Sequence, residues 1–320
     1  MKILLWHVDS DWTTAFVHGG HHYVVPVTPD RGPDGRGRAC VTEWPNTVTE
    51  CAVEQLSNEE FDVVILQRPH EIDLVHGWTG QRPGRDLPAI YVEHAPPVHH
   101  PSNSRHILAD RQDIPVVHVT HFNQLYWDSG IAPTVVIEQG VFDPGPLYSG
   151  ELPRAATHTP HGRSRMSGTD LLGVFAMETP IDVFDTSTID ENERPAKDLS
   201  SRIVRLLPSL PEQLHAQMAR RRVYLHLARW ESLPRGLVEA MYLAMPIVAV
   251  AATEIAYRLP RDAGVVSADI DELASGLRRL VHEPELARLT GQVARNYAVS
   301  RYGLDRYHSE WDRLLKEVAD

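Results

Sequence analysis

Short runs of consecutive apolar residues recur along the first half of the chain, separated by polar or amphipathic stretches. The runs cover residues 3–8, 23–27, 61–66, 89–92, 116–119 and 135–137. Runs that do not alternate with polar residues are typical of strands covered on both faces, as in a parallel sheet flanked by helices. Intervening segments such as 41–56 and 122–129 are long enough for crossover helices. Residues 1–145 are therefore predicted to form one Rossmann-like α/β domain.

The same pattern returns in the second half, after a segment rich in Pro, Gly, His, Ser and Thr. That composition disfavours regular elements, so residues 146–168 are predicted to be a linker and entry loop. Beyond it the sequence predicts strands at 181–184, 223–227 and 247–250 and helices at 211–220, 234–243, 271–281 and 284–298. We therefore expect a second Rossmann-like domain over residues 169–300. Residues 301–320 are predicted to form a helix with one apolar face.

Composition supports an ordinary globular protein of two domains. The chain has 320 residues, 42% of them apolar and 23% charged, and a net charge of −12. An acidic surface repels phosphate backbones, so we expect a small-molecule partner and no nucleic acid. The first apolar run meets Asp9 and Asp11 at once and is too short for a signal-peptide core or a membrane span. The predicted location is cytoplasmic, with peripheral attachment to the inner membrane face left open.

Cysteine and histidine spacing gives no metal-site pattern. Cys40 and Cys51 lack zinc-ligand spacing and are expected to be reduced. Two histidine clusters, at residues 18–22 and 99–100, lack an H-E-x-x-H arrangement and a carboxylate at helical spacing. No catalytic metal and no prosthetic group are expected.

The segment WESLPRGLVEAMYLAMPIVAV, residues 230–250, carries the strongest chemical signal. Pro234 suits the first position of a helix, where its missing N–H costs nothing. The helix N-terminus would then lie at Ser232 to Gly236, where backbone N–H groups and the helix dipole favour a diphosphate. Gly236 would leave room for its close approach, and Glu239 could reach a ribose from the same face of the helix.

This segment resembles the Glu-x7-Glu motif of the retaining GT-B glycosyltransferases of family four. The residues that match are Glu231, Ser232, Leu233, Pro234, Gly236, Leu237, Glu239, Ala240, Met241, Pro246, Ile247 and Val248. The resemblance implies two Rossmann-like domains facing across a cleft, and a final helix that packs back on the N-terminal domain. It also implies transfer of a sugar from a nucleotide diphosphate sugar, without a metal and with retention of anomeric configuration.

The resemblance assigns roles to individual residues of the motif. Glu231 would hydrogen-bond the donor sugar hydroxyls, and Glu239 would bind the ribose. The sugar and diphosphate would be held by Ser232, Leu233, Pro234, Arg235 and Gly236. UDP- and GDP-sugars are the favoured donors; a small molecule, a glycan and a lipid precursor all remain open as acceptor.

Two further stretches resemble the same family. IAPTVVIEQGVFDPG places Gly140 and Asp143 at a turn that closes the family's first domain. YVEHAPP places His94 directly after a predicted buried strand, where the resemblance implies a histidine near the reacting carbon of the donor. A histidine at the carboxyl end of such a strand would face the interdomain crevice.

The chain departs from the family pattern at two positions. In HGRSRMSGTDLL the residue at the family's lysine position is Ser167, which leaves Arg163 and Arg165 to stabilise the departing diphosphate. Ala244 stands where the family usually has glycine. These departures leave open a second class of function, a binding or regulatory partner without catalysis. A third reading, a sugar-nucleotide epimerase of the same fold, lacks this glutamate motif.

Overall fold

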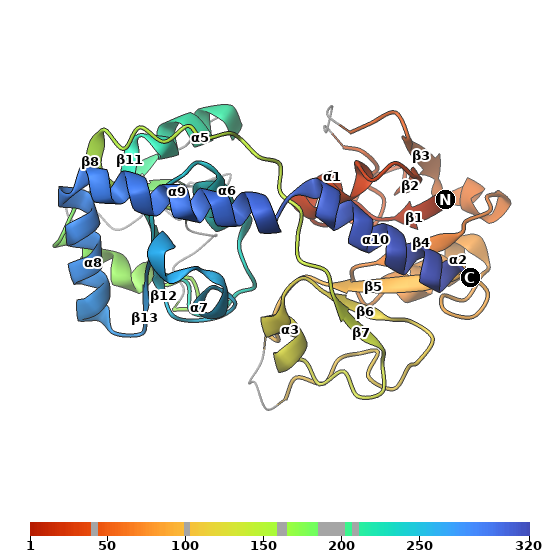
Figure 1. Cartoon of the computed structure of the whole chain (residues 1–320). Helices are drawn as coiled ribbons and strands as arrows, with labels where there is room; N and C mark the ends of the chain where they lie inside the picture. Colours follow the sequence, from red (N-terminus) through yellow and green to blue (C-terminus); the bar gives the residue numbers. More distant parts are fainter. Residues whose placement is uncertain (40–43, 99–102, 159–164, 185–201, 207–210) are drawn as a thin grey trace. The chain divides into compact units, whose positions relative to one another are not determined.

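The computed structural model in Figure 1 describes the chain except residues 40–43, 99–102, 159–164, 185–201 and 207–210. The described residues divide into two compact units. The first comprises residues 1–142 together with 304–320, and the second comprises residues 143–303. Each unit is built on a parallel sheet with helices, so the predicted α/β class is confirmed.

The first unit holds, in its described part, a seven-stranded parallel sheet in the order β3-β2-β1-β4-β5-β6-β7. Its strands are β1 (Lys2–Leu5), β2 (His22–Val27), β3 (Val48–Ala52), β4 (Val63–Leu66), β5 (Ala89–Glu93), β6 (Val116–His118) and β7 (Thr134–Val136). Its helices are α1 (Ser10–Val17), η1 (Val53–Asn58), α2 (Glu71–Thr79), α3 (His121–Tyr126) and α10 (Leu304–Ala319). A crossover helix over residues 41–56 was a wrong prediction, because β3 and the start of η1 occupy residues 48–56.

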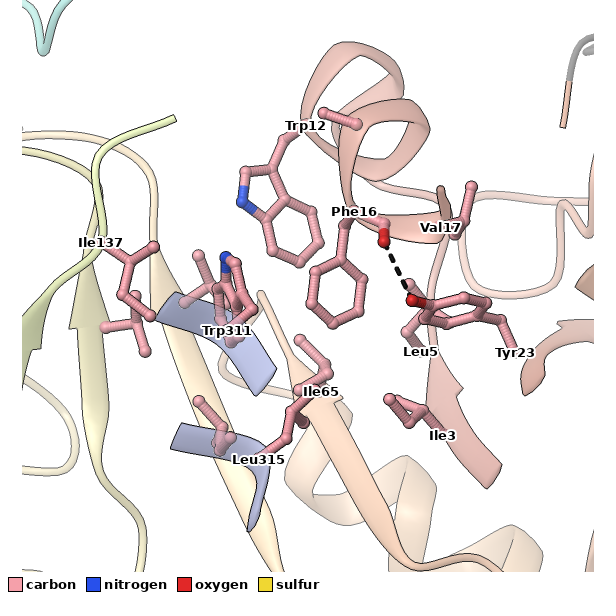
Figure 2. Close-up of a cluster of buried hydrophobic side chains, with 14 of the residues drawn as sticks. Ile3, Leu5, Trp12, Phe16, Val17, Tyr23, Ile65, Ile137, Trp311 and Leu315 are labelled. Carbon is pink, nitrogen blue, oxygen red and sulfur yellow. Dashed lines mark hydrogen bonds between the residues drawn. The ribbon is translucent and has the colours of Figure 1, made fainter. Parts of the chain in front are cut away.

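Helix α10 completes the core of the first unit, although it lies at the far end of the sequence. Trp311 is 2% exposed, and its ring centroid lies 4.9 Å from that of Phe16 and 5.8 Å from that of Trp12. Figure 2 shows these rings above the apolar side chains of the sheet, with the Tyr23 hydroxyl donating to the Phe16 carbonyl oxygen at 3.0 Å. A Cβ on Gly140 would lie 2.7 Å from the ring of Tyr307, so the glycine lets α10 approach the chain there.

The second unit holds, where it is described, a six-stranded parallel sheet in the order β10-β9-β8-β11-β12-β13. Its strands are β8 (Leu152–His158), β9 (Ile181–Phe184), β10 (Ile203–Leu206), β11 (Arg221–His226), β12 (Ile247–Val250) and β13 (Gly264–Ser267). Its helices are η2 (Thr169–Leu171), α4 (Leu172–Ala176), α5 (Pro211–Ala219), α6 (Arg235–Tyr242), α7 (Ile255–Arg258), η4 (Arg261–Ala263), α8 (Ile270–His282) and α9 (Pro284–Arg301).

Strand β8 corrects the prediction that residues 146–168 are irregular. It pairs with β9 and β11 in the middle of the second sheet. Its sequence, LPRAATH, has no bulky apolar run. Ala155 and Ala156 are fully buried, and Arg154 lies 2.9 Å from the carboxylate of Asp182 on β9. The small side chains and the ion pair of β8 explain why its sequence lacks the apolar run that marks the other buried strands.

Helix α6 ends at an alanine in the left-handed conformation. Ala244 has φ +69°, its N–H donates to the Met241 oxygen, and the Met245 N–H donates to the Ala240 oxygen. This pair of bonds is a Schellman motif, whose left-handed position favours glycine. Ala244, which stands where the resembling family usually has glycine, is therefore in a strained backbone conformation.

We expect Ala244→Gly to raise the free energy of unfolding of the second unit by about 0.5–1 kcal/mol, because glycine adopts positive φ without a Cβ penalty. Urea denaturation of the variant measures this change. The matched control is Ala240→Gly in the same helix, which should lower stability by at least about 1 kcal/mol, because Ala240 is helical and fully buried. A loss of stability in Ala244→Gly would show that the alanine methyl group contributes more by packing than the backbone loses by strain.

Candidate functional site

The carboxyl edge of the second sheet gathers the residues of the predicted motif. Strands β8 and β12 flank β11, all three parallel, so the segments that follow them meet at one edge. Ligands of open α/β sheets bind at this edge. Helix α6 begins there with Pro234 as its N-cap, whose carbonyl oxygen accepts from the Leu237 N–H at 3.1 Å. The helix thus begins at Arg235, one residue later than predicted, and Pro234 precedes it.

Glu231 lies in the loop after β11 and faces a histidine from the end of that strand. Its Oε1 is 2.8 Å from Nε2 of His226. The side chain of His226 is 6% exposed and that of Glu231 is 23% exposed. A buried imidazole therefore positions a carboxylate that still reaches solvent, which is the accessibility that a ligand-binding acid needs.

Glu239, the predicted ribose ligand, is engaged by the protein itself. Arg235 Nε donates to its Oε1 at 2.7 Å, and Nε2 of His215 lies 3.3 Å from its Oε2. Burial by itself raises the pKa of Glu239, but the bond from His215 and the charge of Arg235 outweigh it and hold the pKa below the usual value of a glutamate. Glu239 is thus a buried, charged group, and ribose binding through it stays a prediction.

Gly236 makes room for a histidine that the sequence analysis did not identify. A Cβ at this position would lie 2.6 Å from Nδ1 of His158, the last residue of β8. The space that was predicted to admit a diphosphate is, on this side of the glycine, occupied by the imidazole. His158 therefore lies against the first turn of α6.

The segment after the predicted linker packs on the end of β11. Gly168 has φ +74°, and a Cβ there would lie 1.9 Å from the Leu227 carbonyl oxygen, so this position requires glycine. Arg229 donates to both carboxylate oxygens of Asp170, at 2.7 and 3.1 Å. Gly168 and Asp170 thus have a structural role, which is to hold this loop against the segment that follows β11.

The structure describes one of the two arginines that were predicted to stabilise the departing diphosphate. The side chain of Arg165 is 84% exposed and lies 3.6 Å from the carboxylate of Asp170. Arg163 lies outside the described residues. Leu233 is buried, and Ser232 is half-buried in the loop before α6.

Thr253, which the sequence did not single out, follows β12 at the same edge. It has φ +62°, a left-handed conformation that is costly for a β-branched residue, by about 1–3 kcal/mol. It is 5% exposed, and its hydroxyl has no hydrogen-bond partner among the residues that the structure describes. Nothing in a single sequence marks such a residue, because its conformation is imposed by the surrounding fold.

In the first unit, His94 follows β5 directly, as predicted. Its Nε2 lies 3.0 Å from Oε1 of Gln67, which follows β4. The Trp12 ring meets the imidazole edge to face, with centroids 5.3 Å apart. His94 therefore belongs to the carboxyl edge of the first sheet, which lies in a different unit from Glu231.

Known proteins resemble the chain in part of its sequence and in its whole described fold. Residues 195–297 match the family model described as glycosyl transferases group 1, and no curated protein matches the chain in sequence. A crystal structure of Anabaena Alr3699/HepE in complex with UDP has a TM-score of 0.73 at 15% identity, over 99% of this chain and 100% of that one. The chain has the GT-B fold.

Two other GT-B structures are similar to it. Sucrose-phosphate synthase from Thermosynechococcus elongatus has a TM-score of 0.72 at 14% identity, over 99% of this chain and 98% of that one. AviGT4, a glycosyltransferase involved in avilamycin A biosynthesis, has a TM-score of 0.64 at 13% identity, over 100% of this chain and 98% of that one. The part of the GT-B chain that matches the family model lies within its second unit and contains the segment from Glu231 to Glu239.

The described residues contain neither a cluster of metal-binding side chains nor a membrane-spanning helix. Among these residues, no three His, Cys, Asp or Glu side chains form a group that could hold a metal ion. Within the same part of the chain, no helix has both the length and the apolar character needed to cross a membrane.

Proposed function

We propose that the chain is a retaining, metal-independent glycosyltransferase that transfers a sugar from a nucleotide diphosphate sugar to an acceptor hydroxyl group. The observation that carries the proposal is the placement of Glu231 beside the N-terminus of α6, at the carboxyl edge of a parallel sheet. The family model over residues 195–297 and the GT-B fold support it. Structures of Alr3699/HepE with UDP and with UDP-glucose favour a UDP-sugar over a GDP-sugar as donor.

In this proposal the second unit binds the donor. The carboxylate of Glu231, positioned by His226, accepts hydrogen bonds from the sugar hydroxyls. The positive end of the α6 dipole stabilises the diphosphate, and the exposed Arg165 adds charge as the diphosphate departs. The bond from the anomeric carbon to the diphosphate oxygen breaks while a bond to the acceptor oxygen forms on the same face. The acceptor proton passes to the leaving phosphate.

The acceptor is expected to bind the first unit, at the carboxyl edge of its sheet where His94 lies. Trp12 and Gln67 hold the His94 ring there, and Trp12 is itself in the aromatic core. A small molecule, a glycan and a lipid precursor all remain compatible with this edge. The side chain nearest the acceptor would thus be supported by rigid elements.

A second candidate function is a binding protein that keeps the nucleotide-sugar site and has lost catalysis. Ser167 at the position of the family lysine favours it, since Ser167 carries no charge to stabilise a departing diphosphate. Such a protein would bind donor without transferring or hydrolysing it. An assay for released nucleoside diphosphate separates this function from that of the enzyme.

The experiment that tests donor binding is a thermal-shift screen with UDP, GDP, ADP, dTDP and their common sugars, each with and without EDTA. We expect UDP and one of its sugars to raise Tm, with the same shift in EDTA, because the proposed site uses no metal. A ligand at 100 times its Kd stabilises the folded state by about 2.7 kcal/mol. No shift with any nucleotide, in protein shown to be folded, would contradict the proposal. A shift that EDTA abolishes would contradict metal independence.

A further inference from the structure

A line of hydrogen bonds connects the ends of three neighbouring strands in the first unit. Strands β1, β4 and β5 are adjacent in the sheet. The side chain of Gln67, after β4, donates from Nε2 to the backbone oxygen of Trp6, after β1, at 2.8 Å. Its Oε1 lies 3.0 Å from Nε2 of His94, after β5. The Gln67 amide therefore links the segments that follow β1 and β5, the two strands that flank β4.

The partners fix the direction of each hydrogen bond in this line. A backbone carbonyl oxygen can only accept, so the amide group of Gln67 must face Trp6. Its carbonyl oxygen must then face His94, and this oxygen also can only accept. Nε2 of His94 therefore carries a proton. A neutral imidazole has one N–H, so in the neutral ring Nδ1 carries none.

The backbone of Gln67 is also held in place by a hydrogen bond. Gln67 is 7% exposed, and its backbone N–H donates to Oε2 of Glu71 at 2.6 Å. Glu71 is fully buried, and its Oε1 accepts from Arg68 Nε at 2.7 Å. Rotation of the amide would leave the Trp6 oxygen facing another oxygen. The orientation of Gln67 is thus determined by the fold and does not depend on a bound ligand.

The surroundings of His94 favour its neutral form. Burial lowers the pKa of His94, and the negative charges of Asp9, before α1, and Glu93, on β5, oppose this only in part. Gln67 and Trp12, which also contact the ring, are uncharged. The ring is therefore expected to be neutral at pH 7, so the tautomer decides what each nitrogen can do.

We infer that Gln67 is a positioning residue, whose amide oxygen orients the His94 ring and places the proton of the neutral ring on Nε2. Any hydrogen bond between Nδ1 and a substrate hydroxyl group then has the ring as acceptor. Where it concerns turnover, this inference rests on the proposed function. The tautomer itself is a property of the free protein and needs no substrate to be observed.

His7 offers an internal comparison at the same edge of the sheet. Its Nδ1 lies 3.2 Å from the Gly37 carbonyl oxygen, and its Nε2 lies 2.9 Å from Oγ of Ser10. A carbonyl oxygen accepts, so the neutral His7 ring carries its proton on Nδ1, the opposite tautomer. His7 and His94 should therefore give opposite patterns in the same spectrum.

The test is ¹⁵N NMR of the full chain, with the His94 signals assigned by comparison with His94→Asn. In the wild type we expect a protonated Nε2 and an unprotonated Nδ1 for His94, and the reverse for His7. Gln67→Met keeps the side-chain length and removes the amide, so both His94 tautomers should become populated while the His7 pattern stays unchanged. An unchanged His7 pattern and an intact thermal transition show that the variant is folded.

Gln67→Glu tests the same hydrogen bond to His94 by placing a negative charge opposite Nε2. A carboxylate facing Nε2 favours the protonated ring, so the titration midpoint of His94 should move to higher pH than in the wild type. If the chain is a transferase, the acid limb of its kcat/KM profile should move in the same direction, and Gln67→Met should lower kcat/KM roughly tenfold, as expected for loss of an orienting partner.

These readings separate the inference from the proposed function. A protonated Nδ1 in wild-type His94, or a His94 spectrum and titration that neither Gln67 variant changes, would overturn the inference even in an active enzyme. The expected tautomer in a protein without transferase activity would support the inference and contradict the proposed function.

Discussion

Glu231→Ala is expected to abolish sugar transfer while leaving the protein folded, with a loss in kcat of roughly 100- to 1000-fold or more. The carboxylate is 23% exposed and lies 2.8 Å from His226, so its removal takes a charged acceptor from an accessible site. It contributes little apolar packing that a stable fold would miss. Steady-state rates with the donor found in the nucleotide screen measure the effect.

Two further variants sharpen this expectation. Glu231→Gln keeps the shape and removes the charge, so a comparable loss would assign the effect to the carboxylate. Glu285→Gln, at an exposed glutamate paired with Arg288 on the surface of the same unit, is the matched control and should keep the wild-type rate. Activity of Glu231→Ala within a few-fold of the wild type would contradict the assignment of the donor site.

Trp311→Ala is expected to lower the free energy of unfolding of the first unit by about 3–5 kcal/mol, the usual range for removing a buried aromatic side chain. Trp311 is 2% exposed and lies against both Trp12 and Phe16 (Figure 2). Alanine would leave a cavity between α10, α1 and the sheet. Urea denaturation followed by circular dichroism measures the loss.

The control for this prediction lies on the same helix. Arg313 is exposed, and Arg313→Ala should change stability by no more than about 0.5 kcal/mol. A loss below about 1 kcal/mol for Trp311→Ala would mean that α10 contributes little to the core of the first unit, contrary to its burial.

The sequence predicted the two parallel sheets because most of their strands are continuous apolar runs. It failed at β8, where Ala155 and Ala156 are small and Arg154 is compensated by Asp182. An ion pair between two strands leaves no periodic signal in either of them. Strand β3 was missed for a related reason, since two of its residues are exposed and its pattern is not a buried run.

Within the site, the sequence located the loop and the helix but not their supporting side chains. Glu231 and Glu239 are recognisable from local spacing. Their partners His226 and His215, and the His158 that lies against Gly236, are set by the packing of strands and helices. A histidine at the end of a predicted strand is the one available signal. It applies to His226, in the predicted strand 223–227, but not to His158, because β8 was not predicted.

The position of α10 affects the order in which the chain can fold during synthesis. Strands β1 to β7 leave the ribosome first, but the helix that covers Trp12 and Phe16 is made only after the whole second unit. The second unit is continuous in sequence and can close its core as soon as α9 has emerged. The first unit must keep an aromatic surface uncovered until then, a state in which exposed apolar groups favour aggregation or chaperone binding. The part of the chain that is made first is therefore the last to be completed.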